Sequence, residues 1–298
     1  HDGMEFFGLG AAGVWEPNAS ERGVLCMNHE NLEDGTLHEN GVTDAADNGG
    51  ARPQVEIDRE ILAHGVACLE VIKEDGQWRY VKDSAFNRRV TGATEAVISG
   101  PCAGHDALKT KLSPAGDKGF GTLNNCASGR TPWGTYLTCE ENWPGYFVKR
   151  SDRQLDDNRI GIETERGRYG WETAAGDASE VDGEFARFDN TPTADSADKD
   201  YRNEPRTFGY IVEIDPYTGE QAIKRTALGR FRHEGCWPGK LVEGEPVVFY
   251  SGHDSRNEYI YKFVSDAKWD AADARGAGDF KDRLAIGDKY LDKGTLYV

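Results

Sequence analysis

Apolar residues in this chain come in short runs that alternate with polar positions, the pattern of half-buried β-strands. Residues 65–73 (GVACLEVIK) and 77–83 form such a pair across the turn Glu74-Asp75-Gly76, and residues 208–214 (FGYIVEI) and 221–228 form another. A third pair follows at 246–252 and 258–266, and GVLCMNHE at 23–30 adds a single strand. Strands paired across tight Gly/Asp turns predict antiparallel hairpins.

Helical signals are few, and long polar segments separate the hairpins. Only residues 54–64 begin with a pattern suited to a short helix. Residues 31–55 are rich in Gly, Asp and Asn and predict a surface loop, whereas 150–205 predicts a polar, partly mobile insertion. Residues 87–125 are Gly-rich with little periodicity, and we expect loops there that serve function.

The predicted fold class is all-β. A β-propeller with long inter-strand loops and few short helices fits best, and a β-sandwich fits second, because the strands lack the βαβ alternation of a parallel sheet. We expect one domain over residues 1–298, with 31–55 and 150–205 as loop insertions. Residues 293–298 (KGTLYV) stop inside a strand, which predicts a propeller that is incomplete in this chain.

The net charge of −17, from 52 acidic and 35 basic residues, argues against nucleic acid as a partner. No apolar run approaches the roughly 20 residues of a membrane span. The six cysteines include no C-x-x-C pair, so they predict neither a zinc ribbon nor a dense disulfide framework. An anionic substrate would need a local positive island of metals, Arg or Lys.

The stretch at 121–147, GTLNNCASGRTPWGTYLTCEENWPGYF, concentrates the candidate chemistry. It contains Asn124, Asn125, Cys126, Glu140 and Glu141. Carboxylate and amide oxygens suit calcium, whereas a thiolate suits a softer transition metal, so the stretch suggests a mixed metal site. The alternatives are asparagines that cap turns and a cysteine that is a small buried apolar residue.

Further candidates lie at other strand ends and turns. Cys126, Glu141, Glu234 and Asp254 together would supply one soft and three hard ligands. Arg232 stands two positions before Glu234, on the same side of a strand, where it could hold an anionic oxygen.

Four other residues have competing interpretations. Lys118 could bring positive charge to Cys126, or be a solvated lysine; Glu30 could project from a strand end into a site, or lie in a turn. His233 could either orient a metal ligand through a hydrogen bond or lie in the core. For Glu258 we favour a surface carboxylate.

A cysteine hydrolase is a different possibility, since several histidines could activate a thiol. Carboxylates around Cys126 would raise the pKa of the thiol and weaken it as a nucleophile, whereas they would support a metal site. This asymmetry favours metal chemistry.

Six ordered motifs carry a family resemblance: MNHE, NRRVTGAT, the 121–147 stretch, FGYIVEIDP, LGRFRHEG and YSGHDSRNEYIYKFVS. In this order they resemble the PhoX family of alkaline phosphatases. The resemblance implies a β-propeller with clustered iron (Fe³⁺) and calcium (Ca²⁺), hydrolysis of small-molecule phosphate monoesters at alkaline pH, and export to the periplasm or exterior.

The resemblance also assigns roles to individual residues. Cys126 resembles the family's iron-binding cysteine, Glu141, Glu234 and Asp254 resemble metal carboxylates, and Lys118 and Arg232 resemble the groups that hold the substrate phosphate. Weaker correspondences point to Asn124, Asn125, Glu30 and Glu140 as further metal ligands.

Two rivals remain open at this stage. One is a calcium-binding propeller without catalysis, and the other is a calcium-dependent phosphodiesterase or lactonase on the same architecture. Cys126 discriminates between them and the phosphatase, since a purely calcium-binding protein has no use for a thiolate ligand. The oligomeric state is left open.

Overall fold

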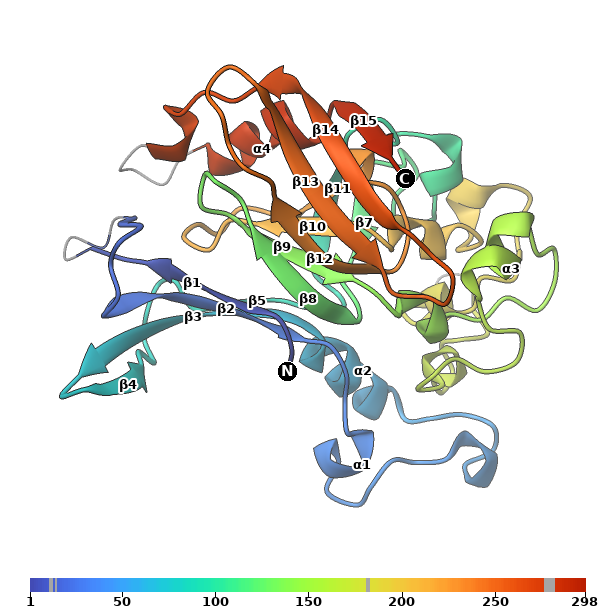
Figure 1. Ribbon diagram of the computed structural model, residues 1–298. Coiled ribbons are helices and arrows are strands. Elements are labelled where there is room, and N and C mark those ends of the chain that lie inside the picture. The colour runs from blue at the N-terminus through green and yellow to red at the C-terminus, as the bar shows by residue number, and fades with distance from the viewer. Residues whose placement is uncertain (11–12, 14, 181–182, 276–281) are drawn as a thin grey trace.

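The computed structural model describes residues 1–10, 13, 15–180, 183–275 and 282–298. Within these ranges the regular structure is mostly β, arranged in three separate sheets of which none closes on itself (Figure 1). The predominance of β-structure that the sequence predicts is confirmed, and the open sheets do not themselves show a propeller.

The first sheet is antiparallel and has the order β1-β2-β3-β4, with β5 also paired to β3. The predicted hairpin of β3 and β4 is confirmed, with Asp75 and Gly76 both at positive φ in its turn. Its strands are β1 (Met4–Gly8), β2 (Arg22–His29), β3 (Gly65–Glu74), β4 (Gln77–Tyr80) and β5 (Arg88–Val90).

The second sheet has the order β7-β6-β11-β10-β9-β8. The hairpin of β10 and β11 is as predicted, but β11 also pairs in parallel with β6. The prediction of loops alone over 87–125 is wrong, because β5, β6 and β7 lie there; strands of three to five residues are too short to show a period. The strands are β6 (Glu95–Ser99), β7 (Lys118–Phe120), β8 (Asn125–Arg130), β9 (Tyr136–Glu140), β10 (Ile211–Ile214) and β11 (Ile223–Arg225).

The third sheet is an antiparallel meander in the order β12-β13-β14-β15. The predicted β13–β14 hairpin and the final strand are confirmed. Helix α4 (Arg283–Leu291) was not predicted; it packs Leu284, Tyr290 and Leu291 inward. The strands are β12 (His233–Pro238), β13 (Pro246–His253), β14 (Ile260–Lys268) and β15 (Gly294–Tyr297).

Two apolar cores hold the sheets together. Phe7 and Val24 of the first sheet pack with Tyr136 and Val212 of the second. Leu137 and Ile211 of the second sheet pack in another core with Phe249 and Phe263 of the third, together with Tyr290 of α4. The second sheet therefore lies between the other two, and its edge strand β8 contacts β1, β2 and β12.

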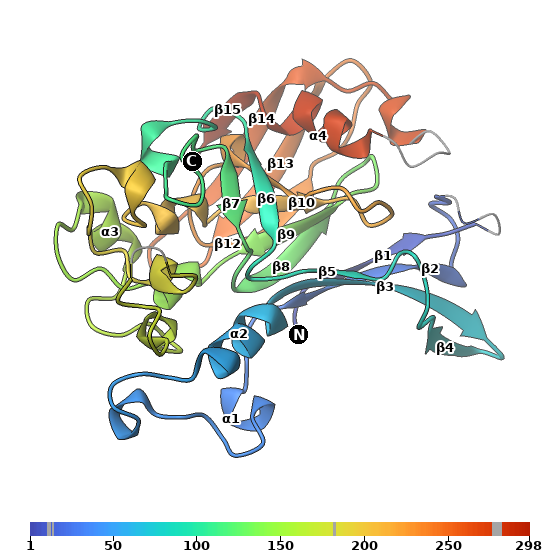
Figure 2. The ribbon, with the colours of Figure 1, turned by 180° about the vertical axis from the view of Figure 1, so that it is seen from behind.

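The described residues of segment 150–205 contain more helical turns than predicted (Figures 1 and 2). It contains α3 (Leu155–Ile160) and short 3₁₀ turns at Trp171–Thr173, Ala186–Phe188, Ala197–Lys199 and Glu204–Thr207. Trp171 and Phe188 are buried in a third apolar cluster with Trp143 and Phe147, so widely spaced aromatic residues anchor an otherwise polar sequence. The predicted helix is α2 (Gln54–Ala63), and the loop 31–55 contains only α1 (Asp34–Leu37) and one 3₁₀ turn, Ala45–Asp47.

Among the described residues, no helix combines the length and apolar character needed to cross a bilayer.

Candidate metal and anion site

Six potential ligands converge where the three sheets meet. β8 carries Cys126, and Glu141 follows β9. The third sheet contributes from β12 and from the turn after β13, and the first sheet from the start of β1 and the end of β2. The complete set is Asp2, Glu30, Cys126, Glu141, Glu234 and Asp254, which we call the acidic cluster.

Irregular backbone places two of these side chains. The β8–β9 pairing shifts register between Asn125 and Ser128, around Cys126. A second shift follows Glu234 in the β12–β13 pairing, where Gly235 adopts φ +79°. Bulges of this kind re-aim side chains and are frequent beside active sites. The glycine in the RHEG motif therefore has a local role, because a left-handed φ favours that residue.

The acidic cluster consists of two groups joined by the thiol. Within each group, Asp2-Glu30-Cys126 and Glu141-Glu234-Asp254, the ligand atoms all lie within 4.8 Å of one another. The Sγ of Cys126 is 3.5 Å from Asp2 Oδ2 and 3.7 Å from Glu234 Oε1. These distances leave room for more than one cation between adjacent ligand groups.

Crowding of like charges shifts the protonation of the cluster. Burial and then the contact with Asp254 raise the pKa of Glu141 to about 7. Burial and the neighbouring carboxylates also raise the pKa values of Glu30 and Glu234. Burial, followed by Glu141 and Glu30, raises the pKa of the Cys126 thiol. In the absence of cations these groups repel one another when they are charged, and bound cations would remove this unfavourable repulsion.

The donor set therefore fits cations of two kinds. Five carboxylates suit calcium, and one thiol among them suits iron or another transition metal. Three carboxylates, Asp2, Glu234 and Asp254, are solvent-exposed and give ions a path of entry. The Sγ of Cys126 donates to the carboxylates of Asp2 and Glu234 rather than contacting a histidine, which disfavours the cysteine hydrolase.

Two asparagines organise the loop that carries Glu141. Asn124, at φ +51°, accepts through its backbone O from Glu141 N (3.0 Å) and through Oδ1 from Asn142 N (2.7 Å). Asn142 Nδ2 donates to Glu141 Oε1 at 2.6 Å, and its Oδ1 accepts from Arg232 Nη1 at 3.0 Å. Asn142 thus connects a carboxylate of the cluster to the arginine beside it.

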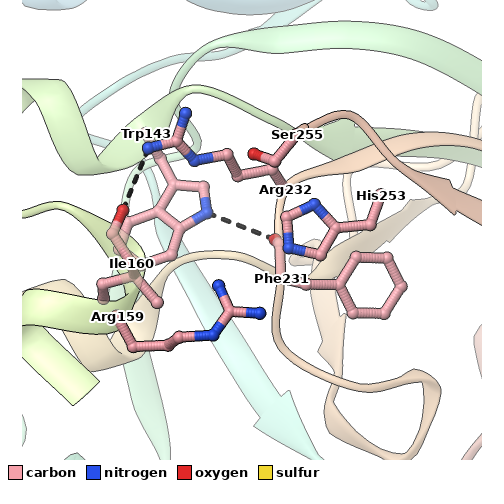
Figure 3. Close-up of a pocket in the computed structure, with 7 residues that line it drawn as sticks. All are labelled: Trp143, Arg159, Ile160, Phe231, Arg232, His253 and Ser255. Carbon is pink, nitrogen blue, oxygen red and sulfur yellow. Dashed lines mark hydrogen bonds between the residues drawn. The ribbon is translucent and has the colours of Figure 1, made fainter. Parts of the chain in front are cut away.

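Arg232 lines a pocket of about 100 Å³ next to the acidic cluster (Figure 3). The backbone N of Asp254 donates to Arg232 O at 3.1 Å, so the pocket and the cluster share backbone. The partners of the Arg232 guanidinium are the neutral oxygens of Asn142 and Ile160, which leave its positive charge available to an anion. The pocket is lined by Trp143, Arg159, Ile160, Phe231, Arg232, His253 and Ser255.

Three predicted site residues lie elsewhere or have other partners. Glu140 is buried, forms an ion pair with Lys224 (2.8 Å) and accepts from two backbone N–H groups, so it is not part of the cluster. Asn125 is buried, and its Nδ2 donates to Thr122 and Thr138. Lys118 is on β7, at the opposite edge of the sheet from β8, and pairs with Glu95 at 2.9 Å.

Lys118 is a half-exposed side chain whose ion pair is with Glu95 of the neighbouring strand β6. This contact agrees with the solvated interpretation of the lysine. Its role in holding a phosphate stays a prediction.

Sequence reasoning missed two charged residues of the site. Asp2 reaches the cluster because β1 pairs with β2, and no motif surrounds it. Arg159 comes from α3, in the segment predicted as an insertion, and pairs with Glu258. The same pair corrects our interpretation of Glu258, whose side chain is nearly buried. His233 is a buried core histidine that bonds Ser251 Oγ and Gly229 O.

Fold and site together define a mostly β protein in which five carboxylates and one thiol cluster beside a pocket lined by Arg159 and Arg232. The chain belongs to the PhoX alkaline phosphatase family, since the family model "Alkaline phosphatase PhoX" matches residues 1–298. It is similar to the structure of Pseudomonas fluorescens PhoX in complex with vanadate, a transition state analogue. The two share 33% identity with a TM-score of 0.79, over 99% of this chain and 44% of that one. A search of curated proteins found no match.

Proposed function

We propose that the chain is part of a metal-dependent phosphatase that hydrolyses phosphate monoesters at alkaline pH. The observation that carries the proposal is the position of the acidic cluster next to Arg232. A protein of net charge −17 needs a local positive charge to hold a phosphate dianion, and cations bound by the cluster would supply it together with Arg232. Family membership and the similarity to a vanadate-bound structure support the same conclusion. The chain spans 44% of that structure's length, so the activity of the whole protein is part of this proposal.

We assign iron to Cys126 and calcium to the surrounding carboxylates. When bound, these cations would act as Lewis acids that neutralise charge on the phosphoryl oxygens. Arg232 would bind a phosphoryl oxygen through its guanidinium. Asn142, which is hydrogen-bonded to both side chains, would hold that guanidinium and the Glu141 carboxylate in a fixed relative orientation. Trp143 and Phe231 form the apolar wall of the pocket and would exclude water from the ester. This scheme requires no serine nucleophile.

Architecture and location belong to the same proposal. The three sheets, packed one on the next, would be successive blades of a β-propeller with the acidic cluster at their junction. Export to the periplasm or exterior follows from the family. The thiol among the carboxylates argues for the phosphatase over a propeller that only binds calcium.

The proposal is tested by steady-state release of phosphate from p-nitrophenyl phosphate at alkaline pH, using protein supplied with iron and calcium. We expect activity that a chelator removes, and an increase in KM on the order of 10- to 100-fold for Arg232→Ala, since a charge-assisted contact is lost. Arg79→Ala, in an exposed ion pair on β4, is the matched control. Hydrolysis only of a diester or a lactone, or an unchanged KM for Arg232→Ala, would contradict the proposal.

A further inference from the structure

Cys26 and Cys68 face each other across two neighbouring strands of the first sheet. They are direct partners in the β2–β3 register, and their Sγ atoms are 3.4 Å apart. Cα atoms of cross-strand partners are about 4.5–5.5 Å apart, which lies inside the roughly 4.4–6.8 Å range of disulfides. We propose that Cys26 and Cys68 are a dithiol that closes to a cross-strand disulfide under oxidising conditions.

The other four cysteines lack this arrangement. Cys102 is exposed, and Cys126 contacts carboxylates. Cys139 and Cys236 are buried on strands of different sheets, β9 and β12, in the core between them. Within the described residues, the contact between Cys26 and Cys68 is the one hydrogen bond that joins two thiols.

The surroundings of the pair favour reaction through Cys68. Arg88 of β5 is the register partner of Cys68 on its other side. The contact with Cys26 and the positive charge of Arg88 lower the pKa of Cys68, whereas burial raises the pKa of Cys26. A thiolate at Cys68 is the nucleophile that disulfide exchange requires.

The oxidant we propose is a low-molecular-weight disulfide such as oxidised glutathione. The Cys68 thiolate attacks one of its sulfurs to form a mixed disulfide and release one glutathione thiolate. Cys26, losing its proton, then attacks the Cys68 sulfur and releases the second, so that two thiols are oxidised and one disulfide is reduced. Both side chains are fully buried, so the exchange takes place during folding or in an opened state of the sheet.

The bond would stabilise the first sheet near the acidic cluster. Two residues beyond Cys26 on β2, Asn28 donates through Nδ2 to Cys126 O at 2.6 Å. Glu30 follows directly after β2. A closed loop between positions 42 residues apart removes conformational freedom from the unfolded chain, and it fixes the strand pairing that presents Glu30.

The test uses the Cys102→Ser protein, which lacks the exposed thiol, and refolds it with oxidised and reduced glutathione. The protein is then unfolded and alkylated without reductant, and its peptides are mapped by mass spectrometry. We expect a linked Cys26–Cys68 peptide pair, two hydrogen masses lighter than the free peptides, with three alkylated cysteines. The melting temperature should rise by roughly 5 to 10 °C over the reduced protein, and this rise should be absent in Cys68→Ala.

Two results would overturn the proposal. One is alkylation of both Cys26 and Cys68 after oxidative refolding, and the other is linkage of either residue to a different cysteine. Because the peptide map is read on unfolded protein, its result does not depend on whether Cys68→Ala folds.

Discussion

Individual side chains in this site are linked by hydrogen bonds and orient one another. Asn142 donates to Glu141 Oε1 and accepts from Arg232, so one amide sets the orientation of a cluster carboxylate and of the guanidinium that lines the pocket. Partners of this kind orient ligands and tune their affinity without touching the ion. The CEEN motif therefore combines a structural carboxylate, Glu140, with a cluster carboxylate and an amide that positions it.

Replacement of Asn142 tests this role. In Asn142→Ala we expect calcium affinity to fall by roughly 10- to 100-fold, because Glu141 loses its orienting donor. Isothermal titration calorimetry measures the affinity for calcium. Thermal unfolding in the presence of a chelator shows whether the substitution also lowers the stability of the metal-free protein. Asn48→Ala, in the exposed loop 31–55, is the control. Equal calcium affinity in Asn142→Ala and the control would exclude a positioning role.

At the scale of elements, buried ion pairs hold the second sheet to its connecting segments. Lys224 of β11 and Glu140 of β9 are both fully buried, and Lys224 also donates to Thr207 O. These two strands lie on either side of β10, so the pair links three neighbouring strands of the sheet. Breaking one partner of a buried pair leaves an uncompensated charge, which costs more than the pair itself contributes.

We expect Lys224→Met to lower the free energy of unfolding by about 3–5 kcal/mol. Urea denaturation followed by fluorescence measures this loss. Lys118→Met removes an exposed pair with Glu95 and should lower the free energy of unfolding far less, because solvent screens such a pair. The double variant Lys224→Met/Glu140→Gln should recover part of the loss. A loss for Lys224→Met no larger than that for Lys118→Met would contradict a structural role for Glu140.

The end of α2 predicts a pH dependence of stability. His64 caps this helix, and its ring bonds Glu60 O and Tyr146 Oη; burial lowers its pKa from 6.5 to about 4. Between those pH values the unfolded chain binds the proton and the folded chain does not, so stability present above pH 6.5 is lost as the pH falls.

The corresponding loss from pH 7 to pH 4 is about 3 kcal/mol for this one group. Urea denaturation at several pH values should show a shallower pH dependence in His64→Gln than in the unchanged protein, although the variant starts from lower stability. His105→Gln, at an exposed position, is the control. Parallel pH profiles for His64→Gln and the unchanged protein would rule out the protonation argument.

At the scale of the whole molecule, the cluster depends on three sheets that are distant in sequence. Cys126 and Glu141 come from one sheet, Glu234 and Asp254 from another, and Asp2 and Glu30 from the first. Without cations the carboxylates of different sheets repel one another, as Glu141 and Asp254 do, so bound cations would hold the sheets together as well as support chemistry.

The sequence predicted much of this arrangement, for identifiable reasons. Hairpins with Gly/Asp turns show a clear period of two, and β3–β4, β10–β11 and β13–β14 appear as predicted. Motifs at strand ends located five of the six cluster residues, whose positions the structure brings together. Their roles as ligands remain predictions.

Long-range pairing explains what the sequence could not reveal. Asp2 enters the cluster through the β1–β2 ladder, and Lys118 pairs with Glu95 across the β6–β7 ladder. Neither fact has a local signal, since register and sheet order depend on the whole core. Helix α4 was missed because its buried face includes Arg283 and Gly287, which interrupt the apolar pattern of a helix.

The most direct test of the account is the metal content of the purified protein, measured by elemental analysis beside phosphate release on the same sample, for the unchanged protein and Cys126→Ala. We predict that the unchanged protein contains iron and calcium and releases phosphate, and that Cys126→Ala loses iron and activity while calcium remains on the carboxylates. Iron content and phosphate release that persist in Cys126→Ala would contradict the central claim that this thiol and its carboxylates form the catalytic cation site.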